Sequence, residues 1–185
     1  YRGVVMTESE RADRAYGVFQ TIARGYDAAN ERISLGRQRR WKRAAIDGLR
    51  LKNTGRGLDL GCGTGDMLEL LAERYPGMEL VGLDFSPNML QVAKERLAGF
   101  ANVSLEQGDA MHLGYADGSF DCVVSAFALR NMASCERAVG EIARVLRPGG
   151  VVCCMDSFVP ECRALLPLYR LYFKRLMPLI GGGIS

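Results

Sequence analysis

The chain has 185 residues, of which 48% are hydrophobic and 24% charged, the size and composition of one globular domain. This composition excludes a disordered, collagen-like or low-complexity chain, and no apolar run approaches the ~18 residues of a membrane helix. The net charge of +3 is unevenly distributed, because residues 32–52 carry eight basic and one acidic side chain. Such a basic flank can meet anionic lipid or nucleic acid, or it can be a solvated helix face.

The six cysteines show no C-x-x-C spacing, and the single histidine, His112, cannot complete a Cys/His cluster. We therefore expect no zinc site. We interpret the cysteines as reduced thiols of a cytoplasmic protein, and His112 as a loop residue without a catalytic role.

Hydrophobic periodicity predicts an N-terminal helix over residues 9–30 and a very basic one over 36–50. Strands are then expected at residues 58–60, 79–83, 103–106, 120–127 and 151–155, and helices at 66–73, 87–98, 135–146 and 160–177. Ser86 and Pro87 have the chemistry of an N-cap and a first helical position. Pro-Gly-Gly at residues 148–150 is expected to end a helix.

Strands that alternate with helices of this length indicate an α/β fold, a Rossmann-like, doubly wound and mostly parallel sheet. We expect residues 1–52 to form a helical cap and residues 53–185 to form the core. Ligands of such sheets bind beyond the carboxyl ends of the strands. The functional residues should therefore directly follow the strands.

The first strand runs into L-D-L-G-C-G-T-G-D over residues 58–66. Its alternate glycines let the backbone turn tightly and approach a ligand. The sequence departs from the G-x-G-x-x-G dinucleotide fingerprint at Asp66 and lacks the Lys-Ser/Thr of a P-loop. The loop is therefore not typical of an NAD site or of a P-loop.

Acidic residues follow the next two strands. Asp84 can accept hydrogen bonds from two ribose hydroxyls, and Phe85 can cover one face of an adenine. Asp109 can accept a hydrogen bond from an adenine amino group, and Met111 can pack on the ring. Either acid alone could be an ordinary loop residue, but their places after successive strands favour a nucleoside site.

These motifs resemble the class I S-adenosylmethionine (SAM)-dependent methyltransferases. A closer resemblance, to the ubiquinone/menaquinone biosynthesis C-methyltransferases, rests on Y-D-A-A-N at 26–30, F-A-L-R-N at 127–131 and R-V-L-R-P-G-G at 144–150. The chain departs from that family's pattern at Gln38 and Asp156, where the family usually has His and Glu. The resemblance implies SAM as methyl donor, S-adenosylhomocysteine as product and a membrane-borne polyprenyl benzoquinol or naphthoquinol as substrate.

The cofactor-binding residues implied by the motifs and the resemblance are Asp59, Gly61, Gly63, Thr64, Gly65, Asp84, Phe85, Asp109, Ala110, Met111 and Ala126. For catalysis we expect Arg130 to stabilise the developing oxyanion of the quinol and Asn131 to orient it or a water. The alternative is a structural ion pair between Arg130 and an acid such as Asp156. Tyr26 and Asp27 either line the substrate side or anchor the N-terminal helix.

The helix expected at 160–177 combines apolar and basic residues and could lie on a membrane surface. Core packing or a homodimer contact is the alternative. We thus expect a cytoplasmic enzyme, and peripheral contact at the inner face of a membrane stays open beside these alternatives. Nucleic-acid methylation is disfavoured, because no Asn-Pro-Pro-aromatic motif follows the fourth strand.

Two other functions stay open at this stage: methylation of another lipid or small molecule, and SAM binding without catalysis. Class I methyltransferase sheets close with a sixth and an antiparallel seventh strand. Because only five strands are evident, we expect the sequence to hold an incomplete domain.

Overall fold

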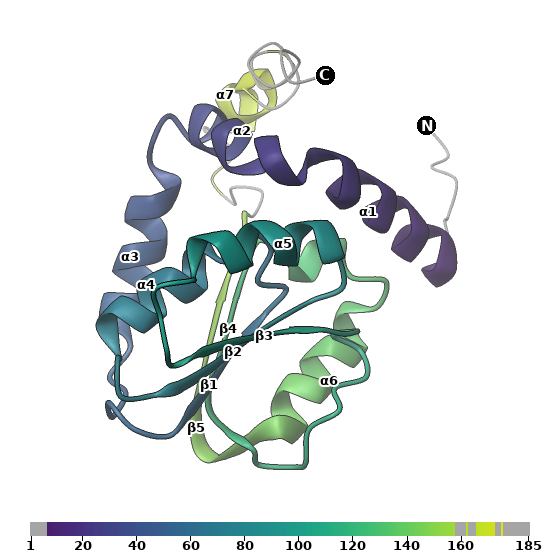
Figure 1. Cartoon of the computed structure of the whole chain (residues 1–185). Coiled ribbons are helices and arrows are strands. Elements are labelled where there is room, and N and C mark those ends of the chain that lie inside the picture. Colours follow the sequence, from purple (N-terminus) through teal and green to yellow (C-terminus); the bar gives the residue numbers. More distant parts are fainter. Residues whose placement is uncertain (1–6, 158–161, 163–165, 173–174, 176–185) are drawn as a thin grey trace.

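The computed structural model describes residues 7–157, 162, 166–172 and 175 (Figure 1). Its five strands are β1 (Arg56–Leu60), β2 (Glu79–Asp84), β3 (Val103–Gln107), β4 (Phe120–Ala126) and β5 (Leu146–Met155). They form one parallel sheet in the order β3-β2-β1-β4-β5. The chain order reverses between β1 and β4, so the switch point lies there. The predicted α/β, Rossmann-like doubly wound fold is confirmed.

Helices cover both faces of the sheet. On one face α4 (Asp66–Arg74) and α5 (Pro87–Arg96) pack on the strands, with α3 (Gln38–Gly48) beside α4. On the other face α6 (Cys135–Val145) covers a second apolar cluster that includes Phe120 and Val145. Ser86 caps α5 through the Met89 amide, and Pro87 is its first residue, as predicted. The five strands are thus held in place by two separate cores.

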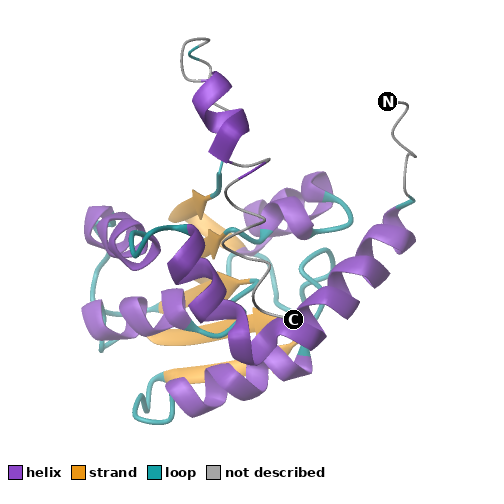
Figure 2. Ribbon diagram, turned by 90° about the horizontal axis from the view of Figure 1, so that it is seen from above, coloured by secondary structure: helices purple, strands orange, loops and turns teal. Residues whose placement is uncertain are grey.

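The N-terminal segment crosses the carboxyl ends of the strands (Figures 1 and 2). The prediction of one helix over residues 9–30 is wrong, because the structure has α1 (Glu8–Ile22), the short turn η1 (Ala23–Gly25) and α2 (Tyr26–Ile33). Ala23 of the turn is buried, and η1 packs against α5. This tertiary contact redirects the chain at a place where the helical periodicity continues.

The strand β5 begins earlier than the sequence predicts. It follows α6 directly at Leu146, so Pro-Gly-Gly at 148–150 lies inside the strand and does not precede it. The register with β4 shifts between Phe120 and Cys122, and Gly149 has a φ of 80°. A bulge of this kind accommodates Pro and Gly within a strand.

Half of the residues of the helix expected at 160–177 lie outside the described residues. Its described part contains α7 (Leu166–Leu171), next to α2 in Figure 1. Within the described segments, no helix combines the length and apolar character needed to cross a bilayer.

Candidate active site

A cavity of about 330 Å³ lies at the carboxyl edge of the sheet. The loops after β1, β2, β3 and β4 form its floor, and side chains of α1 and α2 contribute to its wall. Most of the predicted site residues line it: Gly61, Gly63, Asp84, Phe85, Asp109, Ala110, Met111, Ala126 and Asn131. Because the cavity adjoins the switch point, the topology places it where doubly wound folds bind ligands.

The glycine loop after β1 is held against β2. The amides of Gly61 and Cys62 both donate to the carbonyl of Leu83, and the Gly63 amide donates to Asp84 Oδ2 at 2.8 Å. Gly61 has a φ of 71°, and a Cβ on it would lie 2.6 Å from the Ala128 Cβ. Only glycine fits here, so the backbone itself forms this part of the cavity wall.

The second oxygen of Asp84 accepts the Ser86 amide at 2.9 Å. Burial raises the pKa of Asp84, while the amides of Ser86 and Gly63 oppose that rise. Asp109 is more exposed, and its Oδ1 accepts the Met111 amide at 2.9 Å. Both carboxylates are therefore oriented by backbone donors at the edge of the cavity.

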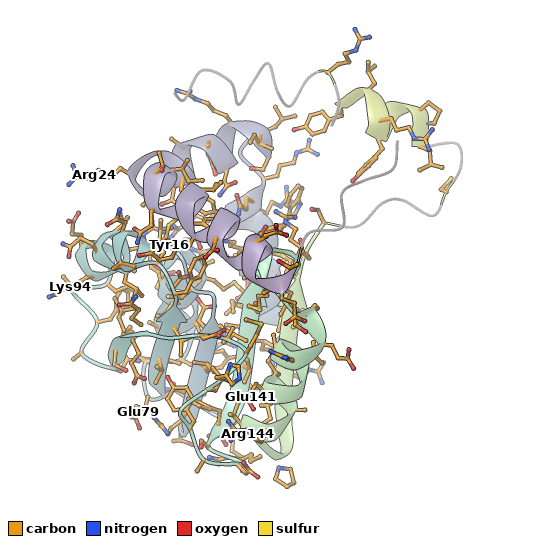
Figure 3. The ribbon with its side chains drawn as sticks, turned by 90° about the vertical axis from the view of Figure 1, so that its right-hand side faces the viewer. Tyr16, Arg24, Glu79, Lys94, Glu141 and Arg144 are labelled. Atoms are coloured by element: carbon orange, nitrogen blue, oxygen red, sulfur yellow. The ribbon has the colours of Figure 1, made fainter. Side chains whose placement is uncertain are left out.

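Aromatic rings from the N-terminal helices close the β2 side of the cavity. The Phe85 ring lies 5.9 Å from that of Tyr16 and 6.0 Å from that of Phe19, between ring centroids. In Figure 3, Tyr16 lies on the side of α1 that faces the rest of the molecule. Sequence periodicity assigns Tyr16 and Phe19 to an apolar helix face, but it does not reveal that this face covers a ligand cavity.

Three predicted cofactor residues do not line the cavity: Asp59 in β1, and Thr64 and Gly65 of the glycine loop itself. Asp59 is 1% exposed, and its two carboxylate oxygens accept no hydrogen bond of normal geometry from the described residues. Burial raises its pKa to about 8, although the nearby Lys42 ammonium lowers it. A buried carboxyl without a hydrogen-bond partner is rare and costly, and the raised pKa favours its neutral, protonated form near pH 7.

Polar contacts fasten the N-terminal helices to the glycine loop. Thr64 Oγ1 donates to Asp27 Oδ1 at 2.7 Å, and Asp27 also pairs with Arg96 of α5. Lys42 of α3 is buried and lies 2.6 Å from both carboxylate oxygens of Asp66, at the start of α4. Of the two roles considered for Tyr26 and Asp27, Tyr26 therefore takes the first, because it lines the cavity. Asp27 takes the second and anchors the helix.

The segment after β4 brings Phe127, Arg130 and Asn131 to the opposite side of the cavity. Phe127 has a φ of 58°, an unusual value for a residue with a side chain. Its amide donates to the Met155 carbonyl at 2.7 Å, and its own carbonyl accepts Asn131 Nδ2 at 3.0 Å. These two bonds hold the ring on the cavity wall despite the strained backbone.

Arg130 does not itself line the cavity. Its Nη1 donates to Asp156 Oδ1 at 2.7 Å and to the Ser157 hydroxyl, and its Cζ lies 5.5 Å from the Phe127 ring centroid. The structural ion pair considered from the sequence is therefore present. Its Nη2 and Nε make no hydrogen bond within the described part of the chain, and these donors are available to another group.

The R-V-L-R-P-G-G motif has a structural role, and none of its residues lines the cavity. Arg144 donates to Glu141, to the Leu113 and Tyr115 carbonyls, and to Asp117. The Arg144 guanidinium lowers the pKa of Glu141 to about 2, and Figure 3 shows the two side chains on the same helix. This network fixes the loop that follows Met111, so the motif supports the site indirectly.

Comparison with known proteins gives a consistent result. The sequence model of the ubiE/COQ5 methyltransferase family matches residues 6–185. The chain is 43% identical over 169 residues to the demethylmenaquinone methyltransferase of Thermus thermophilus, covering 91% of this chain and 77% of the relative. It is 39% identical over 170 residues to the protein of the same name from Staphylococcus aureus, covering 91% and 70%.

Among solved structures, it is similar to phosphoethanolamine N-methyltransferase 2 of Haemonchus contortus, determined in complex with S-adenosyl-L-methionine. The TM-score is 0.58 at 25% identity, covering 79% of this chain and 36% of that chain.

Proposed function

Because the chain belongs to the ubiE/COQ5 methyltransferase family, we propose that it transfers a methyl group from SAM to a ring carbon of a polyprenyl quinol, with demethylmenaquinol as the acceptor. The family membership confirms the resemblance drawn from the motifs and identifies the chain as a methyltransferase. Relatives named demethylmenaquinone methyltransferase support the choice of a naphthoquinol over a benzoquinol.

One observation carries the proposal. The glycine loop, Asp84, Asp109 and Asn131 follow four different strands and converge on one cavity at the switch point. Residues so distant in sequence share a cavity only because parallel strands end at one edge of the sheet. This arrangement supports a nucleoside on one side of the cavity and an acceptor on the other.

The residues present fit SAM in two respects. Gly61 and Gly63 line the cavity with backbone alone, which leaves room for a ligand against the loop, and Asp59 beneath the loop is an orphaned buried acid. In our proposal Asp84 accepts from the ribose hydroxyls, Asp109 accepts from the adenine amino group, and Phe85 packs on the ring. Asp59, once ionised, places negative charge under the loop. When bound, SAM supplies an electrophilic methyl group on a positively charged sulfonium.

The acceptor carbon becomes nucleophilic as its neighbouring hydroxyl loses a proton, so the site needs positive charge near that oxygen. Arg130 is permanently charged, and Asp156 and the Phe127 ring hold its guanidinium next to the cavity. We assign Arg130 to the developing oxyanion through the nitrogens that its ion pair leaves free. Asn131 reaches the cavity and retains Oδ1 to orient the acceptor hydroxyl or a water.

The direct test is incubation with methyl-labelled SAM and either demethylmenaquinol or a polyprenyl benzoquinol that lacks the ring methyl group, followed by extraction of the lipid. We expect label in the naphthoquinol ring. Label in another added lipid or small molecule would replace the proposed acceptor. SAM binding with no transfer to any acceptor would favour a binding module without catalysis.

A second experiment tests Arg130. Arg130→Ala should abolish turnover and leave the Kd for SAM nearly unchanged, because Arg130 is assigned to the acceptor. Arg137→Ala is the matched control, since Arg137 is also exposed and pairs only with Glu8 among the described residues. Loss of SAM binding in Arg130→Ala, or full turnover, would refute the assigned role.

A further inference from the structure

The helix α3 has three faces: one is buried against the protein, one forms ion pairs with α4, and one makes neither kind of contact in the described structure. Its inward side chains are buried: Gln38, Lys42 and Ile46. Its second face carries Arg39 and Arg43, whose charges are matched by Glu69 and Glu73 of α4. Only the third face is left without a protein partner in the described structure.

This third face, together with the preceding turn, is here called the α3 outer face and consists of Leu35, Arg37, Arg40, Trp41 and Ala44. The helical positions 37, 40, 41 and 44 have the spacing of one helix surface. All five residues are exposed, and neither arginine makes an ion pair with any residue that the structure describes. The face therefore combines unmatched positive charge with two large apolar side chains.

Leu35 and Trp41 have large apolar side chains, yet both are exposed to solvent. Leu35 is 68% exposed and has a φ of 53°, and Trp41 is 48% exposed. A left-handed conformation costs a leucine about 1–2 kcal/mol relative to glycine, and its exposed surface gains nothing from the fold. The exposure of both side chains is explained if they enter an apolar environment outside the protein.

The helix α7 also exposes an apolar and a basic side chain. The Tyr172 hydroxyl, directly after α7, donates to the Ile33 carbonyl at the end of α2, two residues before Leu35. Leu171 of α7 is 52% exposed, and Arg170 beside it is also exposed. A second exposed leucine and arginine thus belong to an element that this hydrogen bond ties to the end of α2.

We propose that the α3 outer face docks the protein on an anionic lipid bilayer. Arginines attract acidic headgroups, tryptophan favours the headgroup level, and an exposed leucine can enter the acyl region. Charge complementarity selects this partner, since the basic segment 32–52 has one acidic residue, Asp47. The sequence left lipid, nucleic acid and a solvated helix face open for the basic segment 32–52, and this proposal selects the lipid.

The α3 outer face lies close enough to the cavity for docking to bring the cavity near the bilayer. On the opposite side of the same helix, Lys42 lies 5.8 Å from the ring centroid of Phe127, which lines the cavity. One helix diameter, about 10–12 Å, and the gap from Lys42 to the Phe127 ring therefore separate the bilayer surface from the cavity wall. The inference that docking delivers a bilayer-borne quinol to the cavity rests on the proposed function. The inference that the face binds a bilayer does not.

Trp41 is the only tryptophan of the chain, so its fluorescence reports on this face directly. We expect a blue shift when the full chain, without SAM or quinol, is mixed with vesicles of phosphatidylcholine and phosphatidylglycerol. Vesicles of phosphatidylcholine alone should give little shift. The absence of a shift with anionic vesicles, or a shift with RNA or polyglutamate in their place, would overturn the proposal.

Paired variants separate local docking from net charge. Arg37→Gln with Arg40→Gln should lower the vesicle partition coefficient by about thirtyfold, from two unmatched arginines. Arg39→Gln with Arg43→Gln removes the same charge from the same helix but from positions matched by glutamates, and should change partitioning far less. Equal losses in both pairs would overturn the assignment to this face. Methyl transfer to a detergent-dispersed quinol should persist in both double variants, so failure of docking is distinguishable from failure of the proposed function.

Discussion

The buried ion pair between Lys42 and Asp66 yields a quantitative prediction. The Lys42 side chain is 5% exposed, and its ammonium is 2.6 Å from each carboxylate oxygen of Asp66. Lys42→Met keeps most of the side-chain volume but removes the charge, which leaves Asp66 and the orphaned Asp59 without a neighbouring cation. Removing one partner of a buried pair typically costs about 3–5 kcal/mol. Because Asp66 is 26% exposed and water can solvate it, we expect the lower end of that range, about 3 kcal/mol.

Urea unfolding monitored by circular dichroism measures this loss. Arg39→Met is the matched control on the same helix, since Arg39 is 50% exposed and its ion pair with Glu69 should contribute less than about 1 kcal/mol. The double variant Lys42→Met with Asp66→Asn should recover part of the stability, because it removes the uncompensated acid. If Lys42→Met were no more destabilising than Arg39→Met, the reasoning from burial would be refuted.

Three further predictions concern single side chains. Phe127→Gly should be about 1 kcal/mol more stable to urea than Phe127→Ala, because only glycine adopts a φ of 58° without strain; the order found at ordinary positions, alanine above glycine, would contradict this. Burial raises the pKa of Asp59 from 3.8 to about 8, so the folded chain holds a proton that the unfolded chain releases, and stability falls as pH rises between these values. Asp59→Asn should flatten that decline and be the more stable protein at pH 8, whereas parallel urea midpoints at pH 5 and pH 8 would exclude the assignment. Asp27→Asn should raise the Kd for SAM about threefold to tenfold in calorimetry by loosening the Thr64 loop, while the exposed Asp47→Asn serves as the unaffected control.

The positions of the strands, apart from the start of β5, could be predicted because the information is local. Apolar runs of strand length, a Ser-Pro helix start at residue 86 and glycines after β1 each depend on neighbouring residues alone. The parallel arrangement then places Asp84 and Asp109 at one edge, since every strand of such a sheet ends on the same side. For this reason the floor of the cavity was accessible to sequence reasoning.

The wall of the cavity was not accessible in the same way. The periodicity of residues 9–30 marks Tyr16 and Phe19 as one face of a helix, but only the packing of η1 on α5 breaks that helix and turns it over Phe85. Likewise, a D-x-G-x-G motif gives no indication that Asp59 is buried without a partner. Burial and orientation depend on contacts between segments far apart in the chain.

The sequence by itself determined the fold class, the family and the strand ends that carry glycine or acid. Only the tertiary structure decided that Asp27 anchors while Tyr26 faces the cavity, that Arg130 is held by Asp156, and that one face of α3 is left uncovered. The physical reason is that propensity and periodicity act over a few residues. Ion pairs, burial and exposure are set by which distant elements pack together.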